Sequence, residues 1–237
     1  MTRSKIITAL ALTTMLTGGI SCIKKDPVAQ ISQVLLVPLS PDAIAVDFVI
    51  NDQIQATTVN YSSTVGTATY GFPYYTINPG TTSVKYNITG STVAYASAST
   101  MIEPETAYST FLIDSANKSK MAIVKDDLTE PSPGRVKLRF FHFSPNAPAI
   151  DVAKVGGATL FTNRTFNDQS NAALQQFIEV DAGAYVFSFR TAGTTTEVYK
   201  TSTVNLLPDR IYTLAARGFV GGTTNKALGA LVYANRP

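Results

Sequence analysis

The chain has 237 residues, of which 45% are hydrophobic and only 15% are charged, and its formal net charge is +3. This composition is typical of globular domains and excludes a largely disordered chain, and no basic cluster points to a nucleic-acid partner. A single cysteine excludes a disulfide within the chain.

The first predicted element is a lipoprotein signal peptide over residues 1–22. Arg3 and Lys5 form a positive start, residues 6–16 form an apolar run, and small residues precede Cys22. The apolar run is too short to span a bilayer as a helix, so it reads as an export signal. A lone cysteine at this place resembles the lipid acceptor of bacterial lipoproteins, which implies a chain anchored in the outer membrane through lipidated Cys22.

A tether over residues 23–30 follows the signal. Its Lys-Lys-Asp run at 24–26 resembles the surface-export signal of Bacteroidetes lipoproteins, which implies exposure at the cell surface. The alternative is an ordinary cleaved signal peptide that leaves Cys22 as a free thiol, because Gly19 stands where lipoprotein signals usually carry leucine. Removing residues 1–22 lowers the net charge to +1, since two basic and no acidic residues are lost.

The rest of the chain repeats itself at an offset of about 104 residues. Residues 40–47 (Ser-Pro-Asp-Ala-Ile-Ala-Val-Asp) return as residues 144–151 (Ser-Pro-Asn-Ala-Pro-Ala-Ile-Asp). The turn at 77–80 (Ile-Asn-Pro-Gly) returns at 180–183 (Val-Asp-Ala-Gly). Because these anchors keep their order and spacing, they predict two homologous domains of an ordinary domain size.

We place the first domain at residues 31–126 and the second at 135–237. Residues 127–134 are rich in acidic residues, proline and glycine, and are interpreted as the linker. The acids at its start, Asp126 and Asp127, are expected to be solvated surface groups.

Both copies show the pattern of β-strands. Short runs of β-branched and aromatic residues lie between turn residues, and only residues 168–176 are a weak helical candidate. The pattern predicts an all-β chain of two tandem immunoglobulin-like or fibronectin III-like antiparallel β-sandwiches. The clearest strand segments are 45–50, 83–88, 108–113, 136–141, 185–190 and 228–233.

Two pairs of repeated residues are expected to be structural. Tyr108 and Tyr212 each follow a proline by four residues, which resembles the tyrosine corner of such sandwiches. Gly80 and Gly183 end the repeated turns, where a positive φ would favour glycine.

These motifs together resemble the family called domain of unknown function 4397. The resemblance rests on Ser-Pro-Asx-Ala-x-Ala-x-Asp, on Pro-x-x-x-Tyr, and on Asp126-Asp127 leading into Arg-Phe-Phe-His at 139–142. The family occurs in bacterial secreted proteins and lipoproteins, often in tandem, so the resemblance implies two exported β-sandwiches. It implies no activity.

The densest aromatic segment supplies the binding candidates. Tyr70 and Phe72 have no counterparts in the second copy, so they could form a platform for a sugar or a protein. The alternative is that they are buried core residues.

The remaining candidates are a metal site and a modification site. Asp47 and Asp151 end the repeated Ser-Pro motif and are weak calcium candidates, although carboxylates of Asx turns fit the same pattern. Asp114-Ser115-Ala116 resembles the O-glycosylation acceptor of Bacteroidetes proteins, which makes Ser115 a candidate for modification. His142 is the only histidine, so zinc sites and histidine-based triads lack ligands.

We therefore expect a non-catalytic cell-envelope lipoprotein without a cofactor. Its partners would be the membrane, reached through the lipid, and a protein or glycan of the envelope, with no nucleic acid. The alternative is a structural subunit of an outer-membrane complex, and a hydrolase that uses two facing carboxylates is the third reading.

Overall fold

The computed structural model describes residues 30–61 and 72–236. The first half contains two four-stranded sheets. Inner sheet 1 has the order β4-β1-β7-β8 and outer sheet 1 the order β3-β2-β5-β6. The strands are β1 (Ser32–Pro38), β2 (Val46–Ile50), β3 (Gln53–Val59), β4 (Tyr74–Ile77), β5 (Gly80–Ile88), β6 (Ala94–Ile102), β7 (Ala107–Ile113) and β8 (Lys120–Asp126).

The second half has the same plan. Inner sheet 2 has the order β12-β9-β17-β18, outer sheet 2 has the order β11-β10-β14-β15, and β13 pairs with β16. These strands are β9 (Arg135–His142), β10 (Ile150–Lys154), β11 (Thr159–Arg164), β12 (Ile178–Asp181), β13 (Gly183–Tyr185), β14 (Phe187–Thr191), β15 (Glu197–Lys200), β16 (Val204–Leu206), β17 (Arg210–Arg217) and β18 (Gly229–Arg236).

The predicted all-β sandwich class is confirmed, with one refinement. The strand pairs are antiparallel except β1 with β7 and β9 with β17, which run parallel in the two inner sheets. In the described part of the chain, helical structure is limited to four 3-10 turns, and none is long and apolar enough to cross a membrane. The weak helical candidate at 168–176 forms two of these turns, Asp168–Ser170 and Ala172–Leu174.

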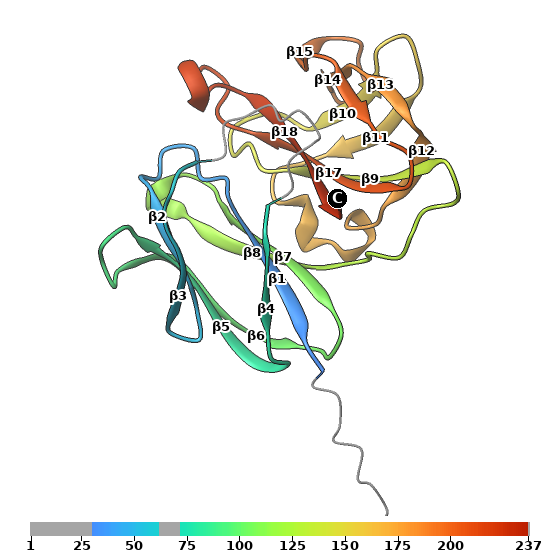
Figure 1. The fold of residues 1–237 in the computed structure, drawn as a ribbon. Helices are drawn as coiled ribbons and strands as arrows, with labels where there is room; N and C mark the ends of the chain where they lie inside the picture. The colour runs from blue at the N-terminus through green and yellow to red at the C-terminus, as the bar shows by residue number, and fades with distance from the viewer. Residues whose placement is uncertain (1–29, 62–71, 237) are drawn as a thin grey trace, which may run out of the picture.

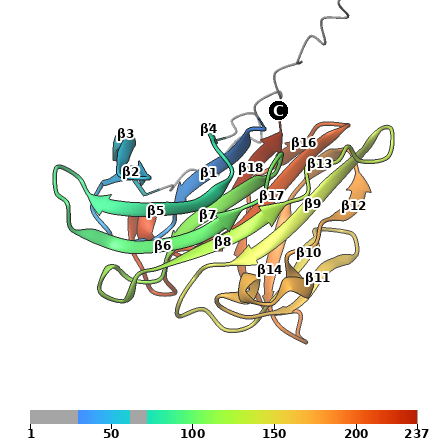
Figure 2. The same cartoon turned by 90° about the horizontal axis from the view of Figure 1, so that it is seen from below.

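The four sheets lie in four layers, from outer sheet 1 through the two inner sheets to outer sheet 2 (Figures 1 and 2). Three apolar cores separate the layers. One core lies within each sandwich, and a third lies between the two inner sheets, where Phe111 meets Phe141 and Phe143. The two sandwiches are therefore packed against each other through an apolar core.

This third core explains why the inner strands carry long apolar runs. In β7 every residue is buried, because alternate side chains face outer sheet 1 (Leu112) and inner sheet 2 (Phe111). Strands that are covered on both faces lose the alternation of polar and apolar residues. The runs in β9 and β17 have the same cause.

The repeated tyrosines and glycines sit at equivalent places in the two halves. The Tyr108 hydroxyl accepts a hydrogen bond from the backbone N–H of Glu103 at 3.5 Å, and the Tyr212 hydroxyl accepts one from Leu207 at 3.1 Å. Gly80 and Gly183 begin β5 and β13 with φ of +121° and +137°. No atom approaches within 4 Å of a Cβ built on either glycine, so backbone conformation alone favours glycine there.

Candidate functional site

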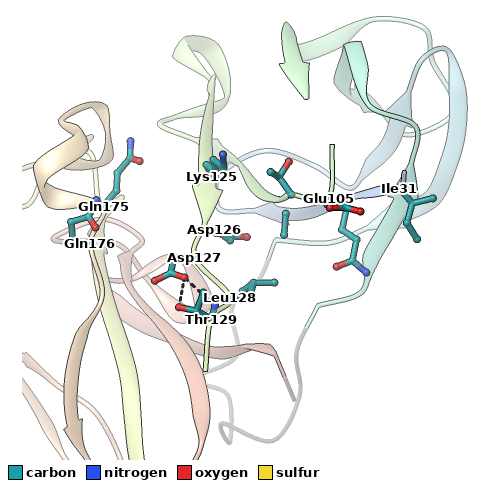
Figure 3. A pocket seen from close by; sticks show the side chains of 12 residues that line it. Ile31, Glu105, Lys125, Asp126, Asp127, Leu128, Thr129, Gln175 and Gln176 are labelled. Atoms are coloured by element: carbon teal, nitrogen blue, oxygen red, sulfur yellow. Dashed lines mark hydrogen bonds between the residues drawn. The ribbon is translucent and has the colours of Figure 1, made fainter. Parts of the chain in front are cut away.

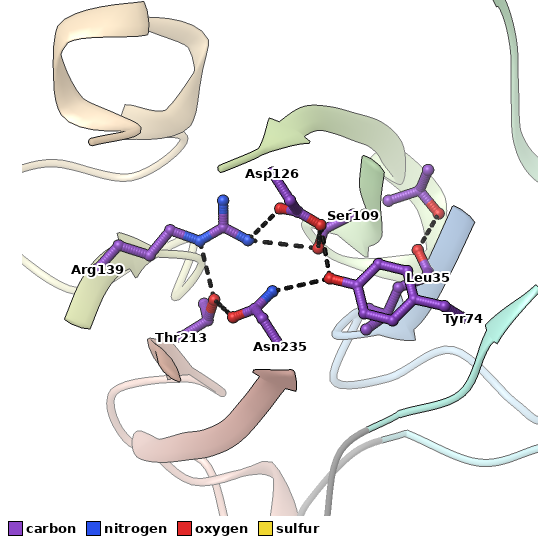
Figure 4. Close-up of polar contacts among 8 residues, drawn as sticks. Leu35, Tyr74, Ser109, Asp126, Arg139, Thr213 and Asn235 are labelled. Atoms are coloured by element: carbon purple, nitrogen blue, oxygen red, sulfur yellow. Dashed lines mark hydrogen bonds and ion pairs between the residues drawn. The ribbon is translucent and has the colours of Figure 1, made fainter. Parts of the chain in front are cut away.

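A buried ion pair joins the two halves at one end of the third core. Nη2 of Arg139 on β9 lies 2.6 Å from Oδ1 of Asp126 on β8, and both side chains are fully buried (Figure 4). Arg139 Nε also donates to the Thr213 hydroxyl at 2.8 Å, and Nη2 donates to Ser109 at 3.3 Å. Asp126 is thus a buried partner of the second half, which corrects the expectation of a solvated surface acid.

Neutral groups complete this network. Asp126 Oδ2 accepts from the hydroxyls of Tyr74 at 2.7 Å and Ser109 at 2.8 Å. Burial, together with the charge of Asp126, raises the pKa of Tyr74, so its phenol stays protonated and donates. Burial acts to lower the pKa of Arg139, but the Asp126 carboxylate outweighs it and holds this pKa above the ordinary value.

The network contains the same pair of groups twice. Ser109 donates to Asp126 in the first half, and Thr213, its equivalent in the repeat, donates to Asn235 at 2.5 Å in the second. Arg139 stands 104 residues after Leu35, which has no charge. Arg139 therefore occupies a position where the other copy of the repeat has a neutral residue.

Beyond this network the inner sheets separate and leave an open cleft of about 870 Å³ (Figure 3). One wall is a row of three residues in register across inner sheet 1, namely Gln33, Ala107 and Asp126. The opposite wall is Gln175 and Gln176, which follow the second 3-10 turn of the second half. The cleft therefore lies between the two sandwiches, with the buried ion pair at its base.

Three of the four charged side chains of the cleft are paired within the protein, and the fourth, Glu105, is exposed. Asp127 accepts from Lys137 at 2.8 Å and from Thr129. Burial acts to raise the pKa of Asp127, but these hydrogen bonds outweigh it and hold the pKa below its ordinary value. Lys125 pairs with Glu103 at 2.5 Å. The cleft is therefore lined by Glu105, by amide and hydroxyl groups, and by the apolar side chains of Ile31, Ala107 and Leu128.

The repeated aspartates serve the turns of the outer sheets. Asp47 accepts from the backbone N–H groups of Thr58 and Gly90, both at 2.9 Å. Asp151 accepts in the same way from Asn163 at 2.7 Å and Gly193 at 2.8 Å. The hydrogen bond from the Gly90 N–H contributes most to lowering the pKa of Asp47, and the hydrogen bond from the Thr58 N–H contributes next. Within residues 30–61 and 72–236, no three His, Cys, Asp or Glu side chains gather where they could hold a metal ion.

Two further predicted residues, Phe72 and Ser115, do not line the cleft. Phe72 is half-buried and its ring stands edge-on to Tyr233 at 5.2 Å, in the core between the inner sheets. Ser115 is half-buried, and its hydroxyl donates to Asn117 at 2.9 Å. Tyr70 and Cys22 lie outside the described residues.

A second buried charged cluster lies entirely within the second half of the chain. Arg164 Nε donates to Asp168 at 2.6 Å, and Asp168 also accepts from the backbone N–H of His142 at 2.9 Å. Burial raises the pKa of Asp168 to about 6 and lowers the pKa of His142. The His142 ring lies 3.1 Å from the carbonyl of Pro148 and is fully buried, which is a structural environment.

Reasoning from the sequence missed Arg139 and the glutamines of the cleft. One signal for Arg139 was available, because it interrupts an apolar strand whose neighbours Leu138 and Phe140 are both buried. A charge inside such a strand requires a buried partner. Gln175 and Gln176 carried no comparable signal, since glutamine in a polar loop is ordinary.

Comparison with known families gives one match. The model of a domain of unknown function, DUF4397, matches residues 32–153, about half of the chain. The matched region starts at β1, includes all of the first half and ends within β10. No curated protein matches the chain. By this match, the chain belongs to the DUF4397 family.

Proposed function

We propose that this protein is a non-catalytic lipoprotein of the cell envelope, and that it binds an extended segment of a protein partner in the cleft between its inner sheets. The observation that carries the proposal is the cleft itself, which is open and is lined by both hydrogen-bonding and apolar side chains. Its two aspartates support a binding role rather than hydrolysis, because Asp126 and Asp127 are already paired with Arg139 and Lys137.

The lining fits a polypeptide better than a glycan. Gln175 and Gln176 each donate to a backbone carbonyl of their own loop, at 2.8 and 3.3 Å, which leaves their amide oxygens as acceptors. Residues 125–129 line the cleft as a continuous stretch that extends edge strand β8. An edge strand and amide side chains match the alternating donors and acceptors of a peptide. Among the residues that the structure describes, the lining contains no aromatic ring on which a sugar face could stack.

The position of the cleft fits a chain anchored through Cys22. Ile31 lines the cleft and stands nine residues after Cys22. Nine extended residues span at most about 30 Å, so a lipid on Cys22 would hold the cleft close to the membrane surface. The partner is then a membrane protein or a protein that lies on the membrane.

Two copies of the DUF4397 domain are part of the proposal. The support is the 104-residue repeat together with the equal strand orders of the two halves, in which β5 and β6 correspond to the interrupted pairs β13–β14 and β15–β16. The family match covers only the first of these halves completely.

Photo-crosslinking in living cells tests the cleft. A photoreactive residue placed at Gln33 or Gln176, both exposed in the cleft, is expected to capture one discrete polypeptide. The matched controls are Gln53 and Thr194, which are exposed but far along the chain from any cleft residue, and these are expected to capture nothing in common with the cleft positions.

Three results would contradict this proposal. Equal capture at cleft and control positions would show that contact is not specific to the cleft. Capture of a glycan at Gln176 would favour the glycan alternative. Recovery of the protein in a stoichiometric complex whose crosslinks avoid the cleft would favour the structural-subunit alternative.

For the anchor, we expect Cys22→Ser to release the protein from the membrane. A serine hydroxyl cannot form the thioether through which a lipoprotein receives its acyl chains, and several chains are needed for stable anchoring. Fractionation of cells followed by immunoblotting measures the change, with Ser21→Ala as the matched control that keeps the cysteine. Membrane retention of the Cys22→Ser protein equal to that of the unchanged protein would refute lipidation.

A further inference from the structure

The two outer sheets end in edge strands of very different character. One edge of outer sheet 1 is β6, a continuous strand of nine residues without a charged side chain or a proline, and the other edge is β3. In outer sheet 2 the corresponding edge is β15, four residues long with Glu197 and Lys200 at its ends, followed by a break before β16. Short, interrupted and charged edges are the usual protection against pairing with another chain. Only the second half has this protection.

The backbone of β6 has hydrogen-bonding groups directed away from its sheet. Ser83 on β5 is paired with Ser99 on β6, but the N–H and C=O of Ser83 bond with Asn51 on the opposite side, at 2.9 and 2.8 Å. In an antiparallel ladder such a pair is not hydrogen-bonded, so the N–H and C=O of Ser99 face the open edge. The same holds for Ser97, two residues away. The carbonyl of Tyr95, on this edge, already accepts from Ser119 at 2.9 Å.

The side chains of the edge are small or apolar. Ser97 and Ser99 are exposed, and Met101 at the end of the strand is 64% exposed. Ala98 lies between the two serines, at the midpoint of the strand. The edge therefore has a neutral and nearly symmetric centre.

We propose that two copies of this chain associate by antiparallel pairing of their β6 strands about a two-fold axis at Ala98. In this register Ser97 of one copy lies opposite Ser99 of the other, with both serines directing backbone groups across the interface. Tyr95 lies opposite Met101, and no like charges meet. Outer sheet 1 of one copy and outer sheet 1 of the other then form one continuous sheet of eight strands.

A second copy fits this edge because a strand with a neutral, symmetric centre is complementary to itself. A two-fold interface uses the same surface on both copies and closes after two, so the exposed edge is consumed without growth into a fibre. No residue of β6 lines the cleft between the inner sheets, so association leaves the cleft open. The proposal stands independently of the ligand proposed above.

Charge exchange at the serines tests the register. The full chain is produced in cells with two different affinity tags, and unchanged copies are expected to co-isolate. Ser97→Lys with Ser99→Lys places a lysine opposite a lysine twice, and we expect co-isolation of this variant with itself to fall by about tenfold. Pairing this variant with Ser97→Glu and Ser99→Glu is expected to restore co-isolation, because each lysine then faces a glutamate.

The matched control carries the same two charges at the other edge of the sheet. Gln53→Lys with Thr57→Lys changes exposed residues of β3 and is expected to leave co-isolation unchanged. Circular dichroism of each variant checks that the β-sheet content is kept. Monomeric behaviour of the unchanged chain, or self-association of the lysine variant equal to that of the unchanged chain, would overturn the proposal. The proposal would also be overturned if the lysine variant still co-isolated with the second copy but no longer co-isolated with a different polypeptide.

Discussion

Arg139→Leu is expected to lower the free energy of unfolding by about 3–5 kcal/mol, because it leaves the Asp126 carboxylate buried without a counter-charge. The Asp126 side chain is fully buried and would keep only the hydroxyls of Tyr74 and Ser109 as donors. Unfolding in urea, followed by circular dichroism, measures the loss.

The double variant Asp126→Asn with Arg139→Leu separates the charge from the packing. Leucine is the residue that stands at Leu35, 104 residues before Arg139, and asparagine keeps the size of Asp126 without its charge. We expect it to recover most of the stability lost in Arg139→Leu, since replacing both members of a buried pair is often close to neutral. A loss in the double variant as large as that in Arg139→Leu would show that the charge is not the cause.

An exposed ion pair provides the matched control for this substitution. Lys85→Ala removes the contact of Lys85 with Asp52 at 2.6 Å, where Asp52 is 77% exposed. We expect a change within about 0.5 kcal/mol, because solvent screens exposed pairs. If Arg139→Leu and Lys85→Ala lowered the free energy of unfolding by the same amount, burial would not account for the contribution of Arg139 to stability.

Phe111→Ala is expected to cost about 3–5 kcal/mol, the range for removing a buried phenylalanine ring. The Phe111 ring, on β7 of the first half, lies 5.8 Å from the ring of Phe141 and 4.8 Å from that of Phe143 in the second half. All three rings are fully buried. The substitution therefore opens a cavity in the core that joins the two inner sheets.

Amide hydrogen exchange shows whether the cavity weakens both halves. We expect Phe111→Ala to raise exchange in β7 and also in β9, which carries Phe141. The matched control is Phe48→Ala, because Phe48 packs on Tyr86 at 5.2 Å inside the first sandwich. Unchanged exchange in β9 of the Phe111→Ala protein would mean that the two halves are stable without the core between them.

Features of the fold that depend on neighbours along the chain could be predicted from the sequence. The strand class follows from runs such as 83–88 and 108–113, because β-branched and aromatic residues between turn residues favour strands whatever lies opposite. The repeat made two equivalent tyrosines visible at 108 and 212, and a tyrosine corner needs only the five residues before it. The parallel pairing of β1 with β7 has no comparable signal in the sequence, because the paired residues of the two strands are about 70 residues apart along the chain.

The cleft and the buried pair could not be predicted in the same way. Asp126 stands beside Asp127 at the start of a polar segment, which is the ordinary context of a surface acid. Its burial depends on Arg139, thirteen residues further on and in a different sheet. One wall comes from β1, β7 and β8 of inner sheet 1, and the loop at 175–176 faces this wall only when the two sandwiches pack.

The sequence by itself determined that this chain is all-β, that it repeats at about 104 residues, and that its single cysteine follows an apolar run near the N-terminus. Those properties are local, since they depend on side-chain shape, turn chemistry and spacing along one stretch of chain. Only the tertiary structure decided that the inner sheets share a core, that Arg139 meets Asp126, and that a cleft remains where the sheets separate. The physical reason is that a side chain's direction follows from its strand, whereas the group it meets depends on which sheet packs against that strand.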